Sequence, residues 1–62
     1  MQYIVFSPAY GQYITTAASW VAAIQNVIAV APGFADDYRA QPLDAFSAKW
    51  QARLLSESQV IA

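Results

Sequence analysis

The sequence predicts a mainly α fold, in which a helical hairpin of two helices, at about 16–31 and 43–59, follows a short β-hairpin or an extended N-terminal arm. Three observations predict it. A long Ala-rich stretch lacks glycine and proline, and a later stretch has apolar residues at helical spacing. The N-terminal residues that precede both are rich in β-branched and aromatic side chains. Residues 1–62 are predicted to be a single small domain, divided into a β-like arm at 1–15 and the helical hairpin at 16–62.

The N-terminal segment carries the β signals. Residues 2–6 and 12–16 are both rich in β-branched and aromatic side chains. Between them Pro8 precedes Gly11 by three residues, a spacing that suits a tight turn. A β-hairpin is one interpretation. The other is a single strand or arm that pairs with a neighbouring chain, because an isolated two-stranded hairpin is marginal in water.

The first helix is predicted from Thr16 to Ala31, because Pro32 and Gly33 end it. Its side chains sort by size onto two faces. A bulky face, expected to form the core, contains Ala17, Trp20, Val21, Ile24, Val27, Ile28 and Ala31. A close-approach face contains Thr15, Ser19, Ala22, Asn26 and Ala29.

The segment 32–42 reads as a loop with one helical turn around Asp36 to Arg39, and the adjacent Asp36 and Asp37 are expected to solvate the loop and cap that turn. Proline at position 42 suits the first turn of the second helix. The bulky stripe of that helix consists of Leu43, Phe46, Trp50 and Leu54. On its polar side Arg53 and Glu57 are one turn apart, so we expect them to form an ion pair.

Composition excludes several classes of function. The chain contains no cysteine and no histidine, which removes disulfides, thiolate chemistry and the commonest metal ligands. Nothing in the remaining inventory supports catalysis, so we expect no enzyme activity, no cofactor and no metal. The net charge is -1 and lysine and arginine are not clustered, so the sequence predicts no positively charged surface that would bind nucleic acid. Stabilisation by oligomerisation or by docking onto another protein is the remaining option for so short a chain.

A membrane segment is the main alternative. The first 35 residues carry no charged side chain, and the stretch 13–31 is long enough to span a bilayer. Gln25 and Asn26 interrupt that stretch, however, and no basic residue follows it closely. The N-terminus also lacks the basic region of a cleavable secretory signal. We therefore expect a cytoplasmic protein, or one assembled into a virion, and keep the membrane subunit as the alternative.

The predicted interface lies in the uncharged half. With only two helices and a hairpin, the chain cannot cover both faces of its first helix, so the close-approach face is expected to pack against a neighbouring subunit, with Asn26 setting the register. The tyrosines of the arm and one tryptophan are further candidates, since Tyr and Trp are enriched at interface hot spots. The other interpretation is that both tryptophans, Trp20 and Trp50, form the core of the chain. The predicted interface residues are Tyr3, Tyr10, Tyr13, Thr15, Ser19, Ala22, Asn26, Ala29 and Trp20.

These observations predict a small, non-enzymatic structural or interaction subunit that buries its uncharged half in a homo-oligomer or a larger protein assembly. A chain so small, without catalytic residues, suits an accessory role in a phage or virion, such as a cement, adaptor or minor structural protein. Two alternatives are a single-pass subunit of a membrane complex, with 13–31 in lipid, and a small protein that inhibits another protein.

Overall fold

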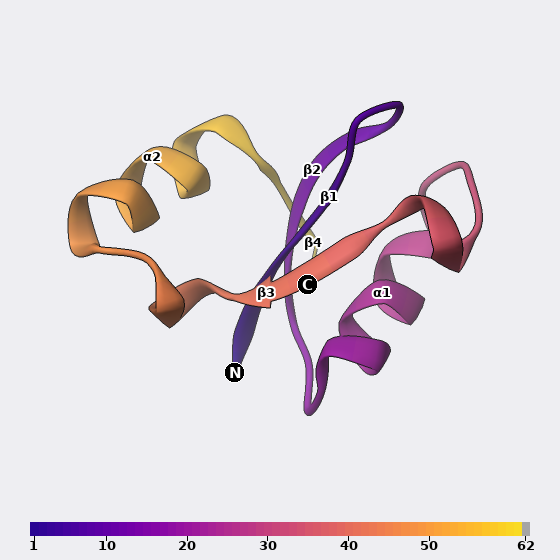
Figure 1. The fold of residues 1–62 in the computed structure, drawn as a ribbon, viewed down its shortest axis with the longest axis horizontal. Helices are drawn as coiled ribbons and strands as arrows, with labels where there is room; N and C mark the ends of the chain where they lie inside the picture. The colour runs from indigo at the N-terminus through magenta and orange to yellow at the C-terminus, as the bar shows by residue number, and fades with distance from the viewer. Residues whose placement is uncertain (62) are drawn as a thin grey trace.

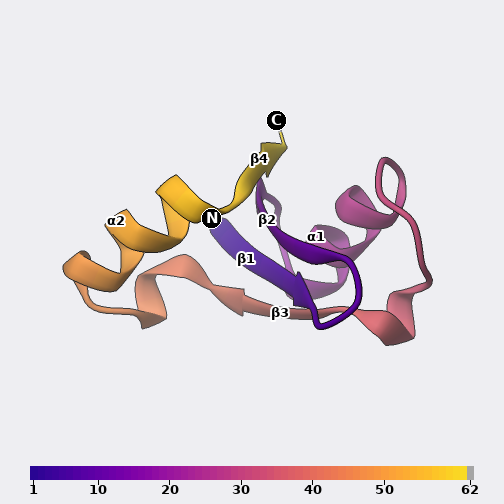
Figure 2. The same cartoon turned by 90° about the horizontal axis from the view of Figure 1, so that it is seen from above.

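A computed structural model describes residues 1–61, and it places a four-stranded mixed sheet at the centre of the chain (Figures 1 and 2). The strand order is β3-β1-β2-β4, so the N-terminal hairpin occupies the middle of the sheet. Strand β1 is antiparallel to both of its neighbours, and β4 is parallel to β2. The elements are β1 (Gln2–Ser7), β2 (Gly11–Thr16), α1 (Trp20–Ile28), η1 (Ala35–Asp37), β3 (Arg39–Pro42), η2 (Leu43–Ala45), α2 (Ala48–Glu57) and β4 (Gln59–Ile61).

The predicted fold class is wrong: the chain is an α+β fold and contains no helical hairpin. The helices α1 and α2 lie at opposite sides of the strands (Figure 1). The helix predicted at 16–31 extends only from Trp20 to Ile28, and the one predicted at 43–59 only from Ala48 to Glu57. Each forms at the centre of its predicted range, and each loses its ends to strands, turns or caps.

The error comes from two short strands that local patterns do not reveal. Residues 39–42, expected to be loop, pair with β1, and residues 59–61, expected to end or follow the second helix, pair with β2. Pro42 has φ -59° and ψ 134°, an extended conformation, so it ends a strand instead of starting a long helix. Both pairings are non-local backbone interactions, which single-residue propensities predict poorly.

The N-terminal segment is a β-hairpin, one of the two interpretations that the sequence allows. The register runs from Gln2 opposite Thr16 to Ser7 opposite Gly11. Gly11 has φ +97°, a conformation that L side chains rarely adopt, which explains glycine at this end of the turn. The Ala9 N–H donates to Oγ of Ser7 at 3.2 Å and stabilises the connection.

One face of the hairpin packs against α1. Tyr3 and Val5 of β1 belong to one buried cluster with Ile24 and Val27 of the helix. The side chain of Ser19 caps the helix by accepting the Ala22 N–H at 3.2 Å. The cluster on this face consists of Tyr3, Val5, Ala23, Ile24, Val27 and Tyr38, with Tyr13, Ala17, Ile28, Ala31, Ala40 and Ile61 packed against it.

The opposite face of the hairpin is covered more thinly. Ile4 and Ile14 are buried there with Leu43 of η2, and only Phe46 and Leu54 add to this cluster. Figure 2 shows α2 extending away from the strands. No residue of α2 is buried, so the helix is attached through η2, Leu54 and the β4 pairing instead of a packed face.

The stretch 13–31, which the sequence left as a possible membrane span, does not form one continuous helix. Its first residues belong to β2, and its only regular helix is the short α1. Within residues 1–61 no helix is long and apolar enough to cross a bilayer.

Gly33 and Gly11 provide a matched test of the packing between the turn and the loop. Both have φ near +95°, but a Cβ on Gly33 would lie 2.6 Å from Cε2 of Tyr10, whereas a Cβ on Gly11 would meet no atom within 4 Å. We expect each alanine substitution to cost about 1–3 kcal/mol of unfolding free energy through backbone strain. Gly33→Ala should cost roughly 1 kcal/mol more, because it displaces the stacked Tyr10 ring.

Urea unfolding followed by circular dichroism measures both costs. Equal losses for the two variants would contradict the close packing of Gly33 against Tyr10.

Candidate interaction surface

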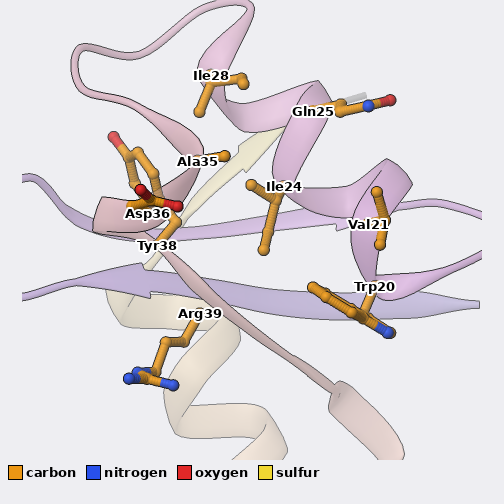
Figure 3. Close-up of a pocket in the computed structure, with 9 residues that line it drawn as sticks. All are labelled: Trp20, Val21, Ile24, Gln25, Ile28, Ala35, Asp36, Tyr38 and Arg39. Atoms are coloured by element: carbon orange, nitrogen blue, oxygen red, sulfur yellow. The ribbon is translucent and has the colours of Figure 1, made fainter.

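An open groove of about 640 Å³ lies between α1 and the segment that leads into β3 (Figure 3). Helix α1 forms one wall with side chains that are mostly apolar, and η1 with the start of β3 forms the other. Trp20 and Val21 lie at the N-terminal end of the helix, and Ile24 points from it toward the strands. The groove is lined by Trp20, Val21, Ile24, Gln25, Ile28, Ala35, Asp36, Tyr38 and Arg39.

Tyr38 forms a buried wall of the groove and fixes the segment before β3. Its hydroxyl donates a hydrogen bond to the Pro32 carbonyl oxygen. Its ring stacks on Tyr10 with centroids 6.0 Å apart and meets Tyr13 edge-on at 6.2 Å. The hydroxyl of Tyr13 in turn donates to the carbonyl oxygen of Tyr10 at 2.9 Å. The hairpin turn and the loop after α1 are thus joined through three tyrosines.

The exposed edge of β3 continues this surface. A second hollow of about 220 Å³ is lined by Trp20, Ile24, Tyr38, Arg39, Ala40 and Gln41. Trp20 and Ile24 therefore border both the groove and the strand edge. The helix and the edge strand form one continuous surface.

The surface is apolar with charge only at its rim. Asp36 and Arg39 are exposed on the side opposite α1, and the helix itself contains no charged residue. Within residues 1–61 no three His, Cys, Asp or Glu side chains come together in a way that could hold a metal ion. The surface therefore offers apolar contact area and backbone hydrogen-bonding groups, which suit binding to protein.

The structure separates the predicted interface residues into three groups. Trp20, Tyr10, Ser19 and Ala29 are exposed, and Trp20 alone of them lines the groove. Tyr3 and Thr15 are buried inside the chain. Tyr13, Ala22 and Asn26 are half-buried.

Asn26, expected to set the register with a neighbouring subunit, instead uses its side-chain amide within the chain. Its Nδ2 donates to Oγ1 of Thr15 at 3.2 Å and to the Thr16 carbonyl oxygen at 3.3 Å. This part of the close-approach face therefore holds α1 to the end of β2.

Neither tryptophan lies in the core, so the core interpretation of both is wrong: Trp20 is 59% exposed and Trp50 is 52% exposed. Their surroundings differ. The guanidinium of Arg53 lies 5.2 Å from the Trp50 ring, and its Nε donates to Oε1 of Glu57 at 2.7 Å, which confirms the predicted ion pair. The Trp50 ring thus has a cationic neighbour, whereas Trp20 lies beside an apolar groove.

Sequence reasoning missed the strand-edge part of the surface. Arg39 and Gln41 are exposed polar residues that flank the small Ala40, which is an alternating pattern, but it spans too few residues to predict a strand. The expected role of Asp36 and Asp37 is confirmed in part. The carboxylate of Asp37 accepts the Phe34 N–H at 2.8 Å and caps η1.

Comparison with protein-family models, with curated proteins and with solved structures finds no match for this chain.

The alkaline pH dependence of stability tests the Tyr38 cluster. Burial raises the pKa of Tyr38 above its usual value, and Tyr13, Tyr10 and Asp37 raise it further. The unfolded chain then releases this proton first, so the free energy of unfolding should be constant up to a pH of about 10 and fall as the pH rises further.

Tyr38→Phe serves as the control for this prediction. It should lower stability at neutral pH by about 1 kcal/mol through loss of the hydrogen bond to Pro32, and it should flatten the decline above pH 10. Urea titrations at pH 8, 10 and 11 measure both effects. An equally steep decline in the variant would contradict the assignment to Tyr38.

Proposed function

We propose that this protein is a non-enzymatic structural or interaction subunit that works by burying the outer face of α1 and the adjoining groove against protein, in a homo-oligomer or a larger assembly. The observation that carries the proposal is the position of Trp20. This large side chain is 59% exposed on an uncharged helix, beside a groove that it lines together with Val21 and Ile24.

The distribution of apolar side chains supports this proposal. The core is small because the chain buries only a few large residues on each face of its sheet. Many other large apolar side chains remain in contact with water. Apolar residues that are scattered over a surface are ordinary, whereas contiguous ones indicate an interaction site. Trp20 and Val21 are adjacent and border one groove. The exposed large apolar residues are Met1, Tyr10, Trp20, Val21, Val30, Phe34, Trp50, Leu55 and Val60.

Charge favours a protein partner for this surface. The groove carries one acidic and one basic residue at its rim and no cluster of positive charge. Nucleic acid and anionic lipid both require such clusters. An interface core depleted in charge and rich in aromatic residues is typical of protein–protein contacts.

Sedimentation of the purified protein without detergent tests the proposal. We expect a species larger than the 6.8 kDa chain at micromolar concentration. Trp20→Ala should raise the dissociation constant by about 30-fold or more, as is typical of a tryptophan hot spot. Trp50→Ala is the matched control, because it removes a similarly exposed tryptophan outside the groove and should leave assembly nearly unchanged.

A stable monomer at every concentration would contradict self-assembly and favour the alternative of a freely diffusing inhibitor. Assembly that depends on Trp50 and not on Trp20 would place the interface elsewhere.

A further inference from the structure

Strand β3 lies at the edge of the sheet and is paired on one side only. The register shows which of its backbone groups are free. The Ala17 N–H donates to the Met1 carbonyl oxygen at 3.0 Å, so this rung of the β1–β2 ladder is hydrogen-bonded. Hydrogen-bonded rungs alternate along an antiparallel ladder, so Tyr3 and Val5 also direct their backbone groups toward β2.

It follows that Ile4 and Phe6 direct their backbone groups toward β3, where they lie opposite Gln41 and Arg39. Ala40 lies between these two residues and opposite Val5, so its N–H and its carbonyl oxygen both point away from the sheet. Ala40 is therefore the central residue of the free edge and offers one donor and one acceptor.

The ends of the same edge limit its pairing. Pro42 lies two residues from Ala40 and has no N–H to offer, which is the position that an edge strand tolerates for proline. On the other side, the Tyr38 N–H already donates to the Ala35 carbonyl oxygen at 3.2 Å. One rung, at Ala40, is thus available for reciprocal donation and acceptance.

We infer that a second copy of this chain binds here, with its β3 antiparallel to the first and the two-fold axis passing between the two Ala40 residues. The inference rests on the proposed function and specifies the partner and the register. Each Ala40 N–H donates to the other Ala40 carbonyl oxygen, so both free groups are satisfied by the same contact. The two four-stranded sheets become one continuous sheet.

Side-chain charges are compatible with this register. Arg39 of each copy lies opposite Gln41 of the second copy, so no like charges meet across the new pair. These flanking rungs are not hydrogen-bonded, which is where opposing side chains approach most closely. Both residues are exposed in the single chain, so the contact requires no rearrangement of the core.

A stable dimer requires more contact area than the strand edge offers, so the adjoining groove must also belong to the interface. A standard interface buries about 800 Å² of each partner, which is roughly a fifth of the 4060 Å² surface of this chain. A four-residue strand edge cannot supply that area alone. Helix α1 packs on one face of the sheet and borders the β3 edge through Trp20 and Ile24. The two-fold axis therefore places the two α1 helices next to each other on the same face of the continuous sheet. The helices then cover the exposed faces of both tryptophans.

Introduction of a charge of either sign at position 41 tests the register. Gln41→Glu places a carboxylate opposite each Arg39, and Gln41→Arg places a second guanidinium there, in both cases twice per dimer. We expect Gln41→Glu to tighten dimerisation and Gln41→Arg to weaken it, with dissociation constants about tenfold apart at low salt. The separation should shrink at 1 M salt because the charges are screened. Sedimentation equilibrium measures each constant.

Gln59→Glu and Gln59→Arg are the matched controls, because Gln59 is an exposed glutamine on the opposite edge strand, β4. They should leave the dissociation constant unchanged. Wild-type assembly that is indifferent to charge at position 41, or sensitive at position 59, would overturn the β3 pairing while leaving the proposed function standing. A chain that remains monomeric in the wild type and in every variant would overturn both the β3 pairing and the homo-oligomeric form of the proposed function.

Discussion

The central β-hairpin is buried on both of its faces, and the rest of the structure depends on that constraint. Val5 and Ile14 are completely buried, and they belong to clusters on opposite sides of the sheet. Successive side chains of a strand point to opposite faces, so a pair of strands with large apolar residues on both faces needs a cover on each side. The chain supplies α1 for one face and η2 with Phe46 and Leu54 for the other.

The two faces of the hairpin are covered unequally, and large apolar side chains remain exposed on the surface of the molecule. Helix α1 contributes three buried residues to its side, whereas α2 contributes none to the other. A chain of this size cannot bury all of its large apolar residues, because small domains enclose a small fraction of their surface. Two of the exposed residues, Trp20 and Val21, lie on α1 and border the groove beside β3. The small core and the exposed apolar side chains thus share one cause, which is a chain too short to bury all of its large apolar residues.

Prediction from the sequence succeeded where the signal was local. The spacing of Pro8 and Gly11 indicated the hairpin turn, and the Ala-rich stretch and the amphipathic stretch marked the centres of α1 and α2. The ion pair of Arg53 and Glu57 followed from helical spacing alone. The ends of the helices were misplaced by several residues. The Ala17 N–H donates to the Met1 carbonyl oxygen at the end of the hairpin, and a helix that began at Thr16 would sacrifice that rung.

The sequence alone was therefore enough to locate a turn at 8–11, with a hairpin as one of two interpretations, and to locate the two helical centres and the uncharged first half. Turn residues, helical periodicity and composition act within a few residues of one another. Only the folded chain shows that 39–42 and 59–61 are strands, that α1 covers one face of the hairpin while η2 covers the other, and that Trp20 faces outward beside a groove. These features arise from backbone hydrogen bonds between segments far apart in the chain. Such bonds are made by groups that almost every residue carries, so they leave little trace in the pattern of side chains.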